Sequence, residues 1–411
     1  MLPLLLGLLL ATNAYAAHII GGVLTYQCLG YTNNNPGTNS RAYRFSMIIY
    51  RDCQSSGAGF DSAADGAYTA TVTVFQAGNN TPIAVYELDP PEINPVDPNP
   101  GNACVVVPPN VCVEQGEYIF PTINLPIISE SYFITYQRCC RNNTITNILN
   151  PGASGATYTI EVTAAAQAAC NNSPVFDDFP PAVLCAGEPF IINHKATDTD
   201  GDLLLYELCS PFLGGGTMGN FGPNGVAPDP DRPPPYNGVN FNAPTYTALN
   251  PMGAASGLAI NPTTGILTGT PNIIGQFVVG ICVSEYRNGV LLSTIRRDFQ
   301  FNVTACQVLV SADLQPNPVN GVYVFNSCGD PSLLFVNQST QQQNINDFRW
   351  EFDISGSPTI VNDWNAAVTF PGPGSYTGRL LLNPGENCSD TAFVQVNIFP
   401  GITADFVSEY D

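Results

Sequence analysis

The chain has 411 residues, a formal net charge of −21 and one lysine, Lys195. Basic residues are too few to build a groove that follows a phosphate backbone, so nucleic acid is excluded as a partner. The 36 prolines, 37 glycines and only 11% of charged residues exclude long charged helices and favour short strands between turns. This length suggests three domains of roughly 100–150 residues.

The N-terminus has the features of an export signal. Residues 1–16 form an apolar run that ends in Ala14-Tyr15-Ala16, a motif typical of a cleaved secretory signal. The run is shorter than the ~20 residues that span a bilayer, so we expect no transmembrane segment. All 13 cysteines lie downstream, where an oxidising compartment preserves disulfides and the odd count leaves at least one thiol unpaired. We therefore predict a secreted or cell-surface protein.

The first predicted domain covers residues 17–172. Its strand-like runs, rich in β-branched and aromatic residues, lie at residues 41–50, 68–75, 132–137 and 156–164. The segment 89–101 is rich in proline and must be an exposed loop, because proline lacks the N–H that an interior strand donates. Cys104 and Cys112 follow it closely enough to bond to each other across that loop.

The second predicted domain covers residues 173–306. Its strand-like runs lie at residues 190–194, 203–208, 275–284 and 297–304. Between them, residues 211–251 are rich in glycine, proline and asparagine and contain Arg232-Pro-Pro-Pro-Tyr236, a stiff polyproline-type segment. We interpret this stretch as a surface loop, with a peptide-like docking site as the alternative.

Three aspartates in this domain form the sharpest local motif. Asp198, Asp200 and Asp202 alternate around a glycine turn, which aims several oxygen atoms at one point, as a hard cation such as calcium requires. Glu188 and Glu285 are the candidates for further ligands. The flanking strands and the missing twelfth-position glutamate exclude an EF-hand. The alternative is an ordinary Asp-Gly turn with solvated carboxylates.

The third predicted domain covers residues 307–400, where short alternating strands and turns are typical of a sandwich. Residues 401–411 begin a new strand, which we interpret as the start of a further domain in a longer protein. Strand order suggests three more disulfides in the second and third domains, namely Cys209–Cys282, Cys185–Cys306 and Cys328–Cys388.

Residues suited to catalysis are few. The two histidines are His18, at the start of the mature chain, and His194, on a predicted strand. No G-x-S-x-G motif accompanies them, so a Ser-His-Asp relay has little support. The adjacent Asp177 and Asp178 do not resemble two carboxyl groups that face each other across a cleft. We predict a protein that is not an enzyme.

Several motifs together resemble large exported surface proteins of Bacteroidota. They are HIIGGVLTYQCLG at 18–30, IYRDC at 49–53, YQRCCRN at 136–142 and GQFVVGICVSEYRNG at 275–289. Residues 257–271 resemble the signature of immunoglobulin-like and cadherin-like bacterial domains, in which the D-x-D-G-D stretch is associated with calcium. Residues 307–400 resemble a polycystic-kidney-disease (PKD) domain, with Trp350-Glu-Phe352 at its tryptophan strand.

The resemblance implies an all-β protein of tandem, disulfide-bonded β-sandwich domains. It also implies relatives among type IX secretion substrates and gliding-motility adhesins. We predict a calcium-stabilised, non-catalytic adhesin or filament stalk that binds a glycan or protein ligand on a surface, or associates with itself into filaments. The alternative is a carbohydrate-binding accessory region of a larger secreted enzyme.

Overall fold

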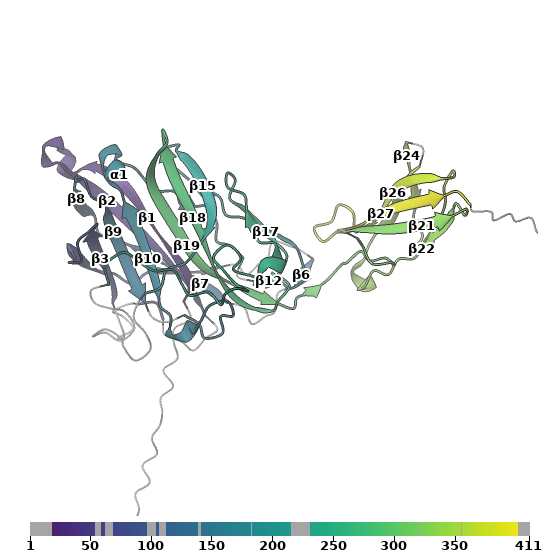
Figure 1. Ribbon diagram of the computed structural model, residues 1–411, viewed down its shortest axis with the longest axis horizontal. Helices are drawn as coiled ribbons and strands as arrows, with labels where there is room; N and C mark the ends of the chain where they lie inside the picture. The colour runs from purple at the N-terminus through teal and green to yellow at the C-terminus, as the bar shows by residue number, and fades with distance from the viewer. Residues whose placement is uncertain are drawn as a thin grey trace, which may run out of the picture. The chain divides into compact units, whose positions relative to one another are not determined.

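The computed structural model describes residues 19–53, 59–61, 69–96, 104–106, 112–138, 141–181, 183–214, 231–319, 321–354 and 356–401. Almost all regular structure is β, as predicted (Figure 1). The chain divides into two compact units, residues 1–101 with 107–305 and residues 102–106 with 306–411. In the described part, no helix is long and apolar enough to cross a membrane. The predicted signal at 1–16 lies outside the described residues.

The first unit is built on one large sheet. Its strand order is β15 (Leu203–Cys209), β18 (Gly275–Arg287), β19 (Val290–Thr304), β1 (Ile19–Tyr31), β2 (Ser40–Asp52), β7 (Val113–Ile119) and β5 (Glu92–Val96). Two short strands extend it, β12 (Val183–Cys185) beside β19 and β8 (Ile123–Pro126) beside β2. All of these pairs are antiparallel except β12 with β19. Segment 89–101 is not wholly the predicted loop, because its exposed residues 92–95 belong to the edge strand β5.

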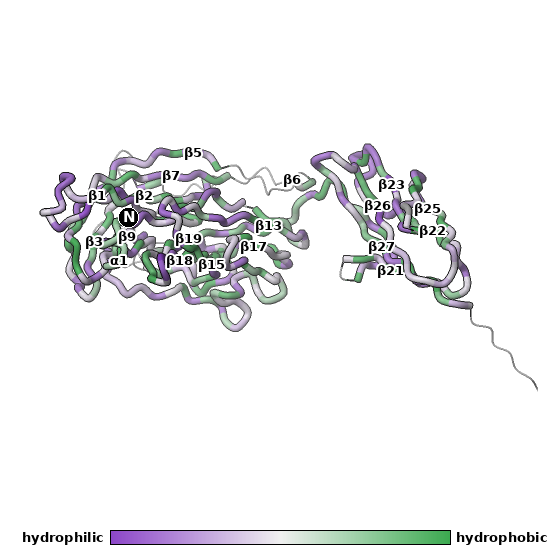
Figure 2. The backbone as a smooth tube through the Cα atoms, turned by 90° about the horizontal axis from the view of Figure 1, so that it is seen from above, coloured by the Kyte–Doolittle hydropathy of each residue, from purple (hydrophilic) through white to green (hydrophobic). Residues whose placement is uncertain are grey.

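A second sheet packs against the large one. Its order is β10 (Ala156–Val162), β9 (Tyr132–Arg138), β3 (Ala70–Gln76) and β4 (Ala84–Leu88). Side chains alternate along these strands, so Ile134 and Tyr136 of β9 face the same buried core as Phe45 and Met47 of β2. Figure 2 shows that hydrophilic and hydrophobic residues follow one another along the strands. The first unit is therefore a β-sandwich.

Short elements complete this unit. They are the six-residue helix α1 (Ala164–Ala169) and the strands β11 (Val175–Phe176) with β14 (Ala196–Thr197), and β13 (Phe190–Asn193) with β17 (Ile266–Gly269) and β16 (Ala259–Ile260). Helix α1 begins at a capping residue, Thr163, whose hydroxyl accepts the N–H of Ala166 at 3.1 Å. Single 3-10 turns of this unit lie at Thr32–Asn34, Pro36–Thr38, Pro151–Ala153 and Ala254–Ser256, and one of the second unit lies at Gln342–Asn344.

The predicted boundary between residues 172 and 173 is wrong, because β1 and β19 are neighbours in one sheet (Figure 1). Gly21 pairs with Phe299, and a Cβ atom at Gly21 would lie 2.2 Å from the Asp298 carbonyl oxygen. Gly21 thus lets strands of the two predicted domains approach closely. Residues 17–172 and 173–306 share one core rather than two.

The second unit is a smaller sandwich. One sheet has the order β21 (Val322–Cys328), β27 (Asp390–Phe399), β26 (Gly374–Leu382), β23 (Phe348–Ile354) and β24 (Ser357–Val361), and β22 (Ser332–Phe335) pairs with β25 (Ala366–Thr369). Trp350, Phe352 and Phe335 are fully buried in its core. The unit begins at residue 306, one residue before the predicted start at 307, and it also includes residues 102–106, because β6 (Val105–Val106) pairs with β20 (Gln307–Val308). Residues 402–411, and with them the predicted further domain, lie outside the described part.

The disulfides confirm one predicted pair, Cys209–Cys282, and contradict two. Cys104 bonds to Cys388 and Cys112 bonds to Cys53, so the predicted Cys104–Cys112 pair is wrong. The reason is the pairing of β6 with β20, which carries Cys104 into the second unit.

Cys328 is free and exposed, so the predicted Cys328–Cys388 bond is wrong too. A fourth described pair, Cys28–Cys170, was not predicted. Cys185 and Cys306 are each disulfide-bonded, and their bond to each other stays a prediction.

Candidate metal centre

A tight turn between β14 and β15 positions three carboxylates. Gly201 has a φ of +81°, a left-handed conformation that glycine adopts without strain. The Asp198 carboxylate accepts the backbone N–H groups of Asp200, at 3.2 Å, and of Asp202. These bonds fold the loop around the Asp198 side chain, as aspartate does in turns generally. The turn therefore gathers Asp198, Asp200 and Asp202 at one end of β15.

Glu285 joins this group from the neighbouring strand β18, where it lies opposite Leu204. The four carboxyl groups of Asp198, Asp200, Asp202 and Glu285 each offer an oxygen atom, and these atoms lie within 4.8 Å of one another. Their burial differs: Asp200 is exposed, whereas Glu285 is 0% exposed. The cluster therefore extends from the surface of the loop to a buried carboxylate on the sheet.

One oxygen atom of Glu285 has no hydrogen-bond partner. Its Oε2 accepts bonds from the Asn171 amide at 2.8 Å and the Ser293 hydroxyl at 2.5 Å, whereas the buried Oε1 has none. Leaving such an acceptor unsatisfied costs about 1–3 kcal/mol, and more for a charged group. The buried oxygen therefore calls for a partner such as a proton or a cation.

Arg287 supplies positive charge at the rim of the cluster. Its guanidinium binds the Asp202 carboxylate through Nε at 2.8 Å and a terminal nitrogen at 2.7 Å, and it lies 3.2 Å from Asp200. The Asn172 backbone N–H and side-chain amide hold Asp200 from the other side, at 2.9 and 2.8 Å. One guanidinium, which contacts two of the four carboxylates, cannot neutralise all of them, so the cluster is negative when all are ionised.

The pKa values in the cluster are driven apart. Burial raises the pKa of Glu285 to about 8, and this outweighs the lowering effect of the Ser293 hydrogen bond. The hydrogen bond from Arg287 lowers the pKa of Asp202. At neutral pH without a cation, Glu285 is therefore mostly protonated while Asp202 is charged.

The structure brings together four of the five predicted ligands and leaves out Glu188. That residue follows β12, which pairs with β19 at Thr304, whereas Glu285 lies opposite Ser293. At ~3.3 Å per residue, positions 293 and 304 of β19 are roughly 35 Å apart. Sequence reasoning also missed the surrounding Asn171, Asn172, Arg287 and Ser293. Of these only Arg287 carried a signal, since it lies on the same strand as Glu285.

His194 is fully buried, with the Phe299 ring at 5.2 Å and the Phe176 ring at 6.5 Å. Both of its ring nitrogens lack hydrogen-bond partners, and burial lowers its pKa well below the usual value. It is therefore placed as a core residue. His18 lies outside the described residues.

No protein-family model and no curated protein matches the sequence. Among solved structures, the chain is similar to fibronectin(III)-like modules of Clostridium thermocellum CbhA, with 9% identity and a TM-score of 0.18 over 58% of this chain and 100% of that one. Sidekick-1 immunoglobulin domains 1–4 have 9% identity and a TM-score of 0.17, over 86% of this chain and 70% of that one. Mouse Cadherin-23 EC22-24 has 12% identity and a TM-score of 0.17, over 80% of this chain and 99% of that one. These values assign the chain to no family.

Proposed function

We propose that this protein is an extracellular, non-catalytic β-sandwich protein of adhesion or surface display, and that the Asp198–Glu285 cluster binds calcium. The observation that carries the calcium assignment is the buried, unpartnered Oε1 of Glu285 beside three aspartates. A divalent cation there would satisfy that oxygen and replace the proton that neutralises Glu285.

The donor set favours calcium among the common metal ions. All four side chains are carboxylates, and hard oxygen donors suit calcium better than zinc, which prefers sulfur and nitrogen ligands. Calcium takes 6–8 oxygen ligands in flexible geometry, and the exposed Asp200 leaves room for water to complete the set.

The disulfides support an extracellular location, because such bonds persist in oxidising compartments. Display on a bacterial surface is supported by the motifs that resemble those of exported Bacteroidota proteins. In such a role the calcium ion is structural: it would fix the β14–β15 loop to β18 and make that end of the sandwich rigid.

Thermal unfolding with calcium chloride or with the chelator EGTA tests the proposal. Saturation at 100 times the Kd stabilises a protein by about 2.7 kcal/mol, so calcium should raise the Tm of the first unit by several degrees. Glu285→Gln mimics the protonated side chain and should fold but lose this shift, while Glu87→Gln, an exposed residue on β4, should keep it. An equal Tm in calcium and EGTA would refute calcium binding.

A further inference from the structure

Residues 231–236 cross the outer face of the second sheet. The Asp231 N–H donates to the Thr73 hydroxyl at 3.0 Å, and the Asp231 carboxylate accepts the Gln137 N–H at 3.0 Å. The Arg232 N–H donates to the Gln137 side chain at 2.9 Å, and the Tyr236 hydroxyl bonds to Thr135 at 2.7 Å. Both ends of the proline run are thus held on strands, so the predicted loop has a defined place.

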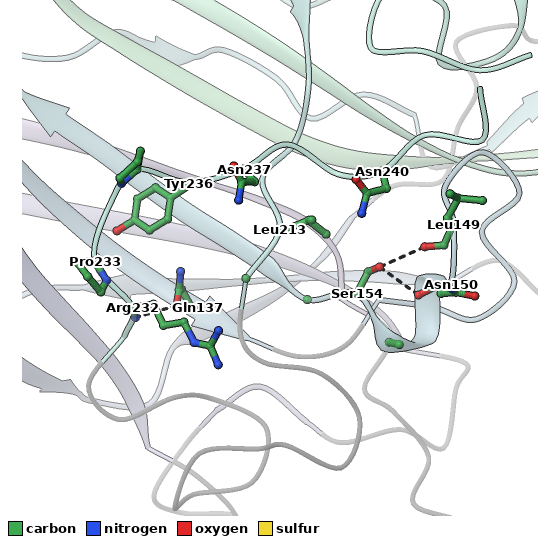
Figure 3. A pocket seen from close by; sticks show the side chains of 14 residues that line it. Gln137, Leu149, Asn150, Ser154, Leu213, Arg232, Pro233, Tyr236, Asn237 and Asn240 are labelled. Atoms are coloured by element: carbon green, nitrogen blue, oxygen red, sulfur yellow. Dashed lines mark hydrogen bonds between the residues drawn. The ribbon is translucent and has the colours of Figure 1, made fainter. Parts of the chain in front are cut away.

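A hollow of about 580 Å³ lies on one side of this segment (Figure 3). Its lining includes the amides of Asn150, Asn237 and Asn240, together with Gln137 and the ring of Tyr236. Each asparagine amide offers both donors and an acceptor, whereas the buried Gln137 amide is already bonded to the Arg232 N–H and the Thr157 hydroxyl. Arg232 is the one charged side chain in the described lining, and it is exposed. This hollow therefore suits a ligand that carries many neutral hydroxyl groups.

A second hollow of about 530 Å³ lies on the other side of Pro235 and Tyr236, which line both. Strand alternation turns Phe133 of β9 outward into it, where it joins Tyr236 and Phe212. The Phe212 ring lies 5.8 Å from that of Tyr236. Three aromatic rings and two prolines thus form its apolar wall.

The polar groups of this second hollow are balanced in charge. Arg296 stacks over Phe212 at 4.0 Å, and Glu161 of β10 also lines the hollow. Neutral polar side chains complete the lining, namely Asn80, Thr159 and Thr294. One positive and one negative group in a protein with a net charge of −21 favour a neutral ligand over an anionic one.

We propose that the two hollows form one groove for a neutral oligosaccharide, which lies across Pro235 and Tyr236. The apolar C–H face of a sugar ring packs on flat aromatic and proline surfaces, and its hydroxyl groups bond to amides and hydroxyls. Both volumes fall in the ~300–1,000 Å³ range of ligand pockets. The fixed segment is ordered before binding, which lowers the entropy cost of association.

Tyr236 is the central residue of this groove, and its ring rather than its hydroxyl is available to the ligand. The hydroxyl already bonds to Thr135. Removal of the hydroxyl alone, in Tyr236→Phe, should therefore leave most of the affinity. Removal of the ring, in Tyr236→Ala, should weaken binding about tenfold or more, as expected for a central aromatic contact.

Titration calorimetry on the full chain tests the groove. The probes are neutral hexasaccharides of glucose, xylose and mannose. Polygalacturonate and a proline-rich decapeptide are titrated separately, to test whether the groove prefers an anionic glycan or a peptide. We expect one neutral hexasaccharide to bind more tightly than about 1 mM. Tyr236→Ala and Phe133→Ala should weaken it, and Phe393→Ala, an exposed residue of the second unit, should not. Circular dichroism confirms that each variant folds.

Absence of binding by every neutral probe, preferential binding of the anion or the peptide, or full affinity in folded Tyr236→Ala would each overturn the proposal. Glycan binding rests on the proposed function only for the display role, and it names the class of ligand that the displayed protein would bind. Calcium binding is measured by melting and glycan binding by titration, so either can fail without the other.

Discussion

Ser293 and Glu285 face each other across the β18–β19 hairpin, and the Ser293 hydroxyl donates a hydrogen bond to one carboxylate oxygen of Glu285. The second oxygen is buried without a partner. The sheet therefore gives the cluster a carboxylate with only one hydrogen-bonded oxygen. Whether Glu285 is protonated or charged then depends on whether a cation is bound beside the β14–β15 loop.

Calcium binding should release a proton. Because burial raises the pKa of Glu285 to about 8, the cation must displace a proton below that pH, and its affinity should rise with pH until about 8. The slope should approach tenfold per pH unit for one proton. Calorimetry at pH 7 in buffers of different ionisation enthalpy measures the protons released.

Glu285→Gln is the control for this prediction, since the amide carries no titratable proton at the same position. Its residual calcium binding should release none. Equal proton release by the variant and the original protein would contradict the role of Glu285.

The Cys104–Cys388 disulfide should stabilise the second unit. It joins residues separated by 284 positions, and Cys104 is buried in the core of that unit. Replacing both cysteines by serine should cost about 2–5 kcal/mol. Trp350 and Trp364 are the two tryptophans of the chain and both lie in the second unit, so their fluorescence in urea reports that unit.

Cys328→Ser is the matched control, because Cys328 is free and exposed. It should change the unfolding free energy by less than about 0.5 kcal/mol. An unchanged urea midpoint in the double serine variant would show that the bond contributes nothing to the stability of this unit.

Local signals could be read from the sequence, whereas long-range pairings could not. The strand at 41–50 and the carboxylate turn at Asp198–Asp202 depend on neighbouring residues, and both lie where they were expected. Cys209 and Cys282 are the one long-range pair whose prediction is confirmed, and they lie on β15 and β18, which pair in the large sheet.

The domain boundary was missed because it depends on a contact between residues far apart. Gly21 and Phe299 pair although they lie near opposite ends of the first unit's sequence, and no local pattern marks that pairing. The Cys104–Cys388 bond was missed for the same reason. The outward turn of Phe133 toward the proline segment likewise required knowledge of which face of the second sheet is covered.

The buried ion pair between Arg141 and Asp298 should be essential to the first unit. The Arg141 guanidinium meets both carboxylate oxygens of Asp298, one of them at 3.1 Å, and also donates to the Gly155 and Phe212 carbonyls at 3.2 Å. Asp298→Asn leaves a buried positive charge and should cost about 3–5 kcal/mol. Urea unfolding followed by circular dichroism measures this cost.

An ion pair nearer the surface provides the comparison. Glu114→Gln breaks the Arg51–Glu114 pair, whose side chains are 24% and 27% exposed, and should cost less than about 1 kcal/mol. If both substitutions cost the same, burial would not determine the contribution of Arg141 and Asp298.

His194 should make the first unit less stable in mild acid. Burial, assisted by Arg297, lowers its folded-state pKa well below 6.5, so the unfolded chain binds a proton that the folded protein excludes. Stability from this residue is therefore complete above about pH 6.5 and falls as the pH drops, by up to about 1.4 kcal/mol per unit.

Glu285 acts in the opposite direction when calcium is absent. Its folded-state pKa is raised to about 8, so the folded protein holds a proton that the unfolded chain loses above pH ~4.3, and stability falls as pH rises through this window. Between about pH 4.5 and 6.5 the two slopes cancel in part. The effect of His194 is therefore measured by comparing Glu285→Gln with the double variant that adds His194→Phe. The first should lose stability from pH 6.5 to 5 and the second should lose less, whereas equal slopes would show that His194 is not the group that titrates.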